Sequence, residues 1–270
     1  MKNKVVVITG GSSGIGKALA MNLGSKGAKI VISGRDEKKL IEAQQELYDQ
    51  GIDCLAVVSD VSNASYVETL IEQTVTKYGQ IDILINNAGI TMRGLLIDTA
   101  PNVLQKVMDV NYMGTVYATK AALPYLLKTK GVIVGITSIA AYHGLPVRSG
   151  YSASKFAMKG FLEAVRTELR HTGVHVLIAA PGFVTSNIRV AALDSDGHVA
   201  GESVRDEANM MTPETCAAII VDGIINRRRS IVMSLMGKMI VFFTKWWPSL
   251  VDRAVYNQLA KEKNSPLAKR

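Results

Sequence analysis

The sequence predicts an α/β protein built on a doubly wound parallel sheet of the Rossmann type, in a three-layer α/β/α arrangement. Strand-like and helix-like segments alternate over the first 185 residues, which is typical of parallel sheets with crossover helices. The strand-like segments are short, continuously apolar and rich in β-branched residues, as expected for strands covered on both faces. No internal repeat or low-complexity linker interrupts the sequence, so we expect residues 1–270 to form a single domain.

The elements follow in order along the chain. The predicted strands are Lys4–Thr9, Lys29–Ser33, Cys54–Ser59, Ile81–Asn86, Gly131–Thr137 and Val174–Ala179. The predicted helices are Ile15–Lys26, Glu37–Gln50, Ala64–Tyr78, Pro101–Leu127 and Tyr151–Arg170. Right-handed crossovers would place these helices on both faces of the sheet.

The pattern changes beyond residue 185. The polar segment Ser186–Thr212 shows no clear periodicity, and a loop of this length indicates a functional lid or a disordered piece. We expect it to be the substrate loop. Pro213–Asn226 is predicted to be a helix, because Thr212 is a favourable N-cap and proline suits the first helical position. Ser230–Ser234 is predicted to be the last strand.

Composition excludes several classes of protein. Apolar residues make up 48% of the chain and charged residues 20%, which suits a large core and is unlike a disordered chain. The two cysteines, Cys54 and Cys216, and the four histidines form no metal-ligand spacing, which argues against a metal enzyme and fits a reducing compartment. No secretory signal and no run of about 18 apolar residues is visible. We therefore expect a cytoplasmic protein.

The net charge of +8 belongs to a C-terminal extension, residues 227–270. This extension holds ten Lys and Arg residues against Asp252 and Glu262, so residues 1–226 are neutral. Within it, Leu235–Trp247 combines large apolar side chains with a narrow polar strip that contains lysines. Such a segment can lie in a membrane interface, or pack as a helix over the substrate cleft or against a partner subunit. Both interpretations predict an apolar pocket mouth.

A glycine-rich loop marks the predicted cofactor site. The first strand leads directly into TGGSSGIG, with Gly10, Gly14 and Gly16, and then into a helix. Glycines let the backbone turn sharply and approach a pyrophosphate, whose charge is stabilised at a helix N-terminus. A glycine cluster alone also suits an ordinary strand–helix turn, but its place after the first strand favours a dinucleotide.

The end of the second strand indicates which dinucleotide binds. NAD-binding Rossmann folds usually place Asp or Glu there to bond the ribose 2′-hydroxyl, whereas this strand ends in Ser33-Gly34-Arg35. The planar guanidinium of Arg35 matches a phosphate, so we predict that it binds the 2′-phosphate of NADP(H). The alternative is a surface arginine that pairs with Asp36 or Glu37.

Tyr151 and Lys155 are the predicted acid–base pair. They lie four residues apart in YSASK, which puts both on one helix face. A phenol with a pKa of about 10 is a poor catalyst at neutral pH. At about 4 Å and an effective dielectric of about 20, a neighbouring ammonium favours the phenolate by on the order of 4 kcal/mol. We therefore expect Lys155 to lower the pKa of Tyr151.

Two polar residues accompany this pair. Ser138 lies at the carboxyl end of a predicted strand, in VGITSIAA, where ligands bind in this fold class. Its hydroxyl is therefore expected to face the substrate oxygen. Asn111 lies in DVNYMGT, within a helix made otherwise of good packing residues, and a buried asparagine there needs hydrogen-bond partners.

At these residues the sequence resembles the short-chain dehydrogenase/reductase family. TGGSSGIG, Asp60-Val61, NNAG at Asn86–Gly89, Asn111, Ser138, YSASK and Pro181-Gly182 occur in that family's order and spacing, over about residues 3–186. The resemblance implies that Tyr151 is the general acid/base in the interconversion of a ketone and a secondary alcohol, and that Ser138 positions the carbonyl. It also implies that Lys155 binds the nicotinamide ribose, and that Asn111 holds a water linking Lys155 to solvent as a proton relay.

The same resemblance implies a set of cofactor-binding residues. Asp60 and Val61 would contact the adenine, Asn87 and Gly89 the adenosine side, and Pro181–Thr185 the nicotinamide amide. The full set expected for NADP(H) is Gly10, Ser12, Ser13, Gly14, Ile15, Gly16, Arg35, Asp60, Val61, Asn87, Ala88, Gly89, Tyr151, Lys155, Pro181, Gly182, Val184 and Thr185.

Further expectations concern substrate and assembly. NIRVAALDSDG together with the basic, aromatic C-terminus resembles a lipid-handling branch of the family, which implies a hydrophobic, long-chain or lipid-like carbonyl substrate. The glycine pair that helps many members to form tetramers does not occur at the C-terminus. We therefore expect a homodimer through the helices containing Asn111 and Tyr151, or a higher homo-oligomer.

Three rival functions carry less weight. A non-catalytic NADP-binding regulator is the main alternative, but all four catalytic positions are filled. The glycine spacing disfavours a nucleotide-sugar epimerase. The basic extension alternates charge with bulky apolar residues and contains no recognition motif, which argues against nucleic-acid binding.

Overall fold

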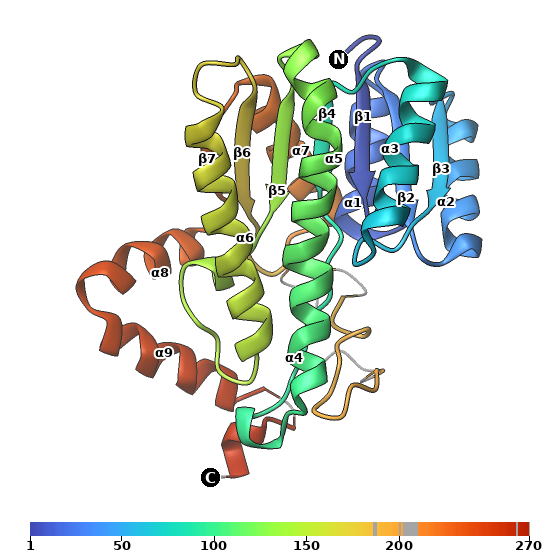
Figure 1. Ribbon diagram of the computed structural model, residues 1–270. Helices are drawn as coiled ribbons and strands as arrows, with labels where there is room; N and C mark the ends of the chain where they lie inside the picture. Colours follow the sequence, from blue (N-terminus) through green and yellow to red (C-terminus); the bar gives the residue numbers. More distant parts are fainter. Residues whose placement is uncertain (186–187, 200, 202–209, 263, 270) are drawn as a thin grey trace.

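The computed structural model describes residues 1–185, 188–199, 201, 210–262 and 264–269 (Figure 1). Within these residues the centre is a seven-stranded sheet with strand order β3-β2-β1-β4-β5-β6-β7, and every pairing is parallel. The strands are β1 (Val5–Thr9), β2 (Lys29–Gly34), β3 (Cys54–Val58), β4 (Ile83–Asn86), β5 (Val132–Ile136), β6 (His175–Ala180) and β7 (Ser230–Val232). The predicted doubly wound fold is confirmed, with strand ends shifted by at most two residues.

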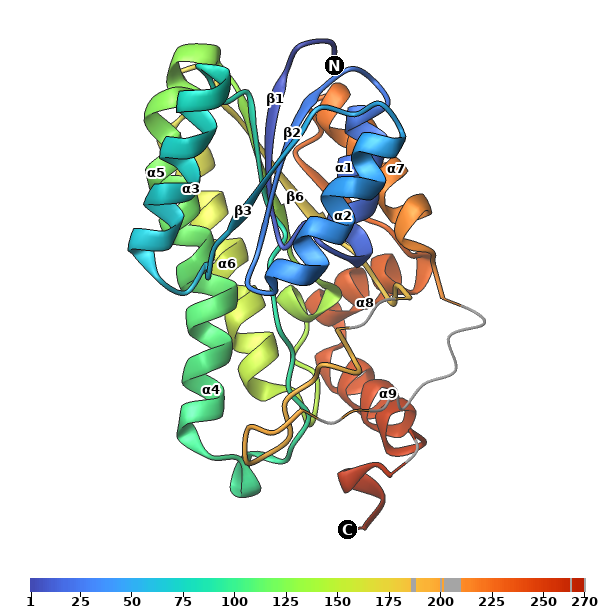
Figure 2. The same cartoon turned by 90° about the vertical axis from the view of Figure 1, so that its right-hand side faces the viewer.

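Helices cover both faces of the sheet (Figure 2). One face carries α1 (Gly14–Gly24), α2 (Glu37–Asp49) and α7 (Pro213–Ile225), and the other carries α3 (Ala64–Tyr78), α5 (Gly114–Thr129) and α6 (Ser149–Glu168). Alternate strand residues supply the two cores. In β1, Val6 and Ile8 pack on the first face, while Val5 and Val7 pack on the second. Burial on both sides explains why the strands are continuously apolar.

The predicted helical segment Pro101–Leu127 is helical throughout, but it is not α-helical throughout. The structure divides it into α4 (Pro101–Met108), a π-helical turn (Asp109–Met113) and α5. In the turn, the side chain of Asn111 bonds the backbone of Ile90, and the backbone carbonyl of Asn111 accepts a hydrogen bond from Thr115 Oγ1 at 2.8 Å. Such turns are rare and are often found at functional sites. Helical periodicity does not reveal the long-range partners that hold this one.

Part of the predicted substrate loop packs along the segment that follows β4. Leu193 forms isolated β-bridges with Met92 and Val199. The sequence DSDG makes a turn in which Asp194 Oδ1 accepts the backbone N–H groups of two residues that follow it. Residues 186–187, 200 and 202–209 of the predicted loop lie outside the described residues. The predicted N-cap Thr212 is confirmed, because its hydroxyl accepts the backbone N–H of Thr215 at 3.2 Å.

The C-terminal extension contains two helices, α8 (Leu235–Trp246) and α9 (Pro248–Ala260), which lie at the carboxyl-end side of the sheet (Figure 1). The sequence predicts the first helix only. Three residues of α9, spaced to fall on one face, bury against the segment before α6. The cluster contains Val147, Val251, Val255, Leu259 and Leu267. The extension therefore packs on the body of the protein.

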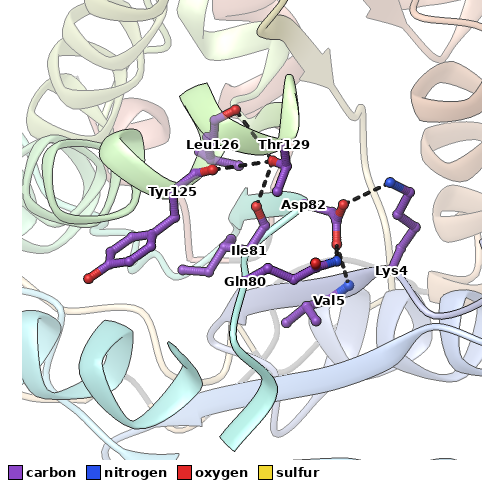
Figure 3. A network of polar contacts seen from close by, with 8 residues as sticks. All are labelled: Lys4, Val5, Gln80, Ile81, Asp82, Tyr125, Leu126 and Thr129. Carbon is purple, nitrogen blue, oxygen red and sulfur yellow. Dashed lines mark hydrogen bonds and ion pairs between the residues drawn. The ribbon is translucent and has the colours of Figure 1, made fainter. Parts of the chain in front are cut away.

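A buried carboxylate, that of Asp82, joins the beginnings of β1 and β4 at the opposite end of the sheet (Figure 3). Its two oxygens accept Lys4 Nζ at 2.8 Å, the backbone N–H of Val5 at 2.9 Å and Gln80 Nε2 at 2.7 Å. Thr129 Oγ1 donates to the carbonyl of the residue before Asp82, at 2.8 Å. Because both of its oxygens have partners, and because it lies away from the strands' carboxyl ends, Asp82 has a structural role.

Candidate active site

Four strand ends bring the predicted site residues together at the carboxyl edge of the sheet. β1 leads to Gly10, β4 to Asn87, β5 to Ser138 and β6 to Pro181. β1 and β4 are neighbours, but the chain continues from β1 toward β2 and β3 on one side and from β4 toward β5 and β6 on the other. Ligands of doubly wound sheets bind beyond the strand ends at such a switch point.

The two loops at the switch point are locked together. Asn87 Nδ2 donates to the carbonyls of Thr9 and Gly10, both at 2.9 Å, and Thr9 Oγ1 accepts the backbone N–H groups of Asn87 and Ala88 at 3.1 Å. Gly10 has φ +65°, a conformation that favours glycine. A Cβ on Gly16 would overlap the carbonyl of Gly10 and crowd the Asn87 amide. These contacts explain why both positions are glycine, and they fix the loop that leads into α1.

The N-terminus of α1 fits an anionic group. Ser13 is its N-cap but makes no side-chain cap hydrogen bond, and the first turn contains no acidic residue. The helices α4, α5, α6 and α9 likewise lack a side-chain cap hydrogen bond, whereas α2, α3, α7 and α8 have a capping side chain. Backbone N–H groups left uncapped at a helix N-terminus, together with the helix dipole, are suited to a phosphate. Ser12, Gly14 and Ile15 belong to the same turn, so the predicted pyrophosphate residues are contiguous in space.

A cavity of about 250 Å³ lies at the end of β2. Its lining includes Arg35, Asp60 and Ser62, together with residues of α4. Arg35 is exposed, and within the described residues it makes no hydrogen bond or ion pair. The alternative partner Asp36 instead caps α2 and pairs with Lys39 at 3.4 Å. The guanidinium is thus available to a ligand.

The two residues predicted to meet the adenine differ in exposure. Asp60 Oδ1 accepts the backbone N–H of Ser62 at 3.0 Å and its hydroxyl at 2.7 Å, which fixes the carboxylate at the cavity wall. Val61 is buried, because Gly114 of α5 leaves room for it: a Cβ on that glycine would lie 2.9 Å from Val61 Cγ2. Val61 does not line the cavity.

The predicted acid–base group lies beyond β5. Tyr151 and Lys155 lie one turn apart on α6, with Lys155 Nζ 5.9 Å from the centroid of the Tyr151 ring. Ser138 follows β5; its hydroxyl accepts the backbone N–H of Ala140 and lowers the pKa of the Tyr151 phenol through hydrogen bonding. Lys155 is buried and donates to the carbonyl of Ile136 at 2.9 Å. The structure therefore brings the three side chains together.

The pKa values of Tyr151 and Lys155 differ from the expectation in one respect. Burial raises the pKa of Tyr151 above its ordinary value, while the Ser138 hydrogen bond and the charge of Arg148 lower it to a lesser extent. The charge of Lys155 is not among the groups that lower the pKa of the phenol. Burial also lowers the pKa of Lys155 to about 8, because removal from water disfavours an ammonium.

Asn111 is held beside this group by its neighbours. Its side chain is fully buried and exchanges two hydrogen bonds with the backbone of Ile90, at 2.8 and 2.9 Å. Asn111 Nδ2 also donates to Ser154 Oγ, which in turn donates to the carbonyl of Tyr151 at 2.7 Å. Ser154 was not predicted from the sequence. The signal that could have indicated it is a small polar residue at the third position after Tyr151.

Gly89 brings Asn111 close to Lys155. A Cβ on Gly89 would lie 3.1 Å from Asn111 Oδ1 and 3.5 Å from Lys155 Nζ. A side chain here would crowd the Asn111 amide and would contact Lys155. This close approach explains why the NNAG sequence ends in glycine.

The segment after β6 connects the site to the C-terminal half of the chain. The carbonyl of Pro181 accepts the backbone N–H of Ile139. A Cβ on Gly182 would lie 2.9 Å from the hydroxyl of Ser234, at the start of α8. Val184 forms a bridge with Met211, and the backbone N–H of Thr185 donates to the carbonyl of Met211 at 2.9 Å.

Apolar side chains surround the phenol. A buried cluster of Met92, Val103, Val107 and Leu193 packs against Tyr151. Leu193 comes from the predicted substrate loop, whereas Met92 follows β4. The surroundings of Tyr151 on this side are therefore apolar.

A second feature, missed by the sequence analysis, joins the extension to the start of α6. Arg148 Nη2 lies 3.3 Å from Glu262 Oε2, and Arg93 Nε lies 3.9 Å from the same oxygen. The Glu262 side chain is 3% exposed. The preceding residue, Val147, has φ +58° and is buried against α9, a conformation that is rare for a β-branched residue. No local sequence signal links positions 114 residues apart.

Comparison with known proteins agrees with this geometry. Residues 4–196 match the family model of the short chain dehydrogenases. The chain is 34% identical to the dehydrogenase/reductase SDR family member 7B of Danio rerio, over 97% of this chain and 87% of that protein. It is 31% identical to a dehydrogenase/reductase SDR family protein 7-like of Drosophila melanogaster, over 98% and 85% of the two chains.

Solved structures of the same fold bind both forms of the dinucleotide. A short chain dehydrogenase/reductase from Burkholderia phymatum in complex with NAD has a TM-score of 0.83 and 26% identity, covering 92% of this chain and 95% of that one. An alcohol dehydrogenase from Thermococcus sibiricus complexed with 5-hydroxy-NADP has a TM-score of 0.75 and 23% identity, covering 86% and 96%, and shows likeness of fold alone. The chain belongs to the short-chain dehydrogenase/reductase family of oxidoreductases, which use a nicotinamide cofactor.

Proposed function

We propose that this chain is an NADP(H)-dependent oxidoreductase that interconverts a ketone and a secondary alcohol, with Tyr151 as the general acid/base. One observation carries the proposal: Tyr151 and Lys155 on α6 meet Ser138 from the end of β5, beside the locked loops of the switch point. When bound, the dinucleotide supplies or accepts the hydride. The protein's residues supply orientation and proton transfer.

Each polar residue then has a defined task. In the reducing direction, Tyr151 donates its phenolic proton to the substrate oxygen, and the Ser138 hydroxyl donates a hydrogen bond to the same oxygen. Burial raises the pKa of the phenol, which keeps it protonated but weakens it as an acid, and the hydrogen bond from Ser138 offsets part of this effect. Lys155 holds the nicotinamide ribose. Asn111, in the π-helical turn, holds a water that relays a proton from solvent to Lys155.

The cofactor residues are assigned by their positions around the switch point. The uncapped turn at Ser12–Gly16 and the neighbouring Gly10 hold the pyrophosphate, which is supported by the missing cap of α1. Asp60, at the cavity wall, meets the adenine, Asn87–Gly89 the adenosine side, and Pro181–Thr185 the nicotinamide amide; the buried Val61 does not line that cavity.

NADP(H) is favoured over NAD(H) by the end of β2. The carboxylate nearest to Arg35 in sequence is engaged by Lys39, and the guanidinium borders the cavity beside Asp60. A free, planar cation at this place is complementary to a 2′-phosphate.

The substrate is proposed to be hydrophobic, because the side of Tyr151 that faces the loop segment is lined by Met92, Leu193 and their neighbours. A series of 2-ketones of increasing chain length tests this. We expect kcat/KM to rise with length, and a preference for short polar ketones would contradict the assignment.

We also propose that the protein is a homodimer through α5 and α6, where Phe156 is exposed; sedimentation velocity would measure this.

The activity is tested with Tyr151→Phe, measured by NADPH oxidation. We expect turnover to fall by about 10²- to 10⁴-fold, the usual contribution of general acid–base catalysis, with NADPH affinity unchanged. Tyr142→Phe is the matched control, since Tyr142 is also half-buried near Ser138 but has no proposed role. Full turnover by Tyr151→Phe would refute the proposal. A wild-type protein that binds NADPH and reduces no ketone would favour the non-catalytic regulator.

A further inference from the structure

We propose that α8 docks this protein on the surface of an anionic lipid bilayer. The helix presents an apolar stripe to solvent, formed by Leu235, Met239, Phe242 and Trp246. Their exposed fractions are 75%, 50%, 56% and 68%. Spacings of four, three and four residues place the four side chains on one face of a helix. A row of large side chains this exposed is unusual on a protein surface.

The opposite face of α8 fixes this orientation. Gly237 is buried, and a Cβ there would overlap the side chain of Ile139. Thr244 Oγ1 hydrogen-bonds His143 Nδ1 at 3.2 Å, and Phe243 packs against the cluster under α9. Because α8 is held on the protein by this face, the apolar stripe cannot turn inward without breaking these contacts.

Charges beside the apolar stripe match an anionic surface. Lys238 and Lys245 are exposed and lie seven residues apart on one flank, and Arg253 is exposed on α9. Over residues 235–260, Asp252 is the sole acidic residue, and its carboxylate lies 3.5 Å from His143. Anionic headgroups attract such a flank, while long lysine side chains keep their ammonium groups at headgroup level.

The composition of the surface favours a bilayer over a second protein. Trp247 and Leu250, which follow the apolar stripe in the sequence, are also exposed. Tryptophan and lysine together are typical of helices that lie in the membrane interface, whereas lysine is depleted in protein–protein interfaces. Among the described residues, no helix is both long and apolar enough to cross a bilayer. The contact would therefore be one of docking on the surface.

This docking would place the site close to the bilayer. Ile139, which packs against α8, follows Ser138 directly, and Ser234 at the start of α8 lies against Gly182. The inference does not depend on the proposed activity, because it uses exposure and charge alone. It does predict that an apolar substrate enters from the bilayer side.

The full-length protein offers a direct optical test. Its two tryptophans, Trp246 and Trp247, both belong to this surface, so intrinsic emission reports on it alone. We expect a blue shift and sedimentation with vesicles of equimolar phosphatidylserine and phosphatidylcholine, and weaker binding at high salt. Met239→Glu/Trp246→Glu should abolish both signals without unfolding the chain, because both side chains are exposed. Lys238→Gln should weaken binding by roughly fivefold.

The matched control is Ile41→Glu on α2, where Ile41 is 55% exposed; it should bind vesicles as the wild type does. Circular dichroism and NADPH binding check that each variant is folded. Wild type that stays in solution with the anionic vesicles would overturn the inference, as would equal binding by Met239→Glu/Trp246→Glu. A blue shift that grows with protein concentration alone, and that the double variant removes, would show that a second copy covers the apolar stripe instead.

Discussion

Replacing Lys155 by methionine removes a charge that the fold holds away from water. Burial lowers the pKa of Lys155 from 10.5 to about 8, so the folded protein binds the proton less tightly than the unfolded chain does. Below pH 8 the ammonium stays charged while buried, which costs on the order of 3 kcal/mol, because each pKa unit corresponds to about 1.4 kcal/mol. Methionine of similar length carries no such cost. Its gain is reduced by the lost hydrogen bond to Ile136, worth about 1 kcal/mol.

We therefore expect Lys155→Met to stabilise the protein by about 2 kcal/mol at pH 7, a rise in Tm of about 4 °C, while abolishing turnover. The difference must shrink as the pH rises, because the wild-type lysine then loses its proton in the folded state too. At pH 10 the burial cost falls below about 1 kcal/mol. Chemical denaturation of both proteins without cofactor, at several pH values from 7 to 10, measures this.

Lys159→Met is the matched control. Lys159 lies one turn further along α6 and pairs with Glu163 at 3.0 Å near the surface, so its removal should change stability by less than about 1 kcal/mol at any pH. The reasoning would be refuted if Lys155→Met were less stable than wild type at pH 7. It would also be refuted if the difference between the two proteins stayed constant up to pH 10.

Three further predictions follow from the site and the sheet. Arg35→Ala should weaken NADPH binding by about 10- to 100-fold and leave NADH binding unchanged; equal losses by titration calorimetry would remove its role at the 2′-phosphate. Gly16→Val should abolish binding of either dinucleotide, because the side chain would overlap the Gly10 carbonyl; normal binding would show that the pyrophosphate does not bind at this loop. Asp82→Ala strands the buried N–H of Val5 and should cost about 2–3 kcal/mol in urea unfolding, while NADPH affinity in the folded protein persists.

The sequence sufficed for the parts of the fold that depend on local patterns. The six strands before residue 185 are evident because burial on both faces makes each an apolar run, and the ends of the helix Ala64–Tyr78 agree with the structure. The site residues at the strand ends could be placed for the same reason: once the strands are parallel, their carboxyl ends share one edge. Pattern and topology together therefore located Gly10 and Ser138, whereas Asn87 and Pro181 were expected from the family resemblance.

Features that depend on distant partners could not be predicted in this way. The π-helical turn at Asn111 exists because its side chain bonds Ile90 and Ser154, which come from two other segments. Burial raises the pKa of Tyr151, whereas Lys155 was expected to lower it. The extent of burial cannot be inferred from the spacing in YSASK. The ion pair of Asp82 with Lys4 likewise joins strands that are remote in sequence.

The start of α6 shows how such a distant partner can support chemistry. Val147 holds a left-handed conformation that costs of order 1–3 kcal/mol, and it persists because residues of α9 bury its side chain. The next residue, Arg148, is held by Glu262 of the extension and is one of the groups that lower the pKa of Tyr151. The extension therefore does more than cover the core. One side of its helices fixes the backbone and the charge that precede the proposed acid. The outer face of α8 leaves an apolar stripe exposed.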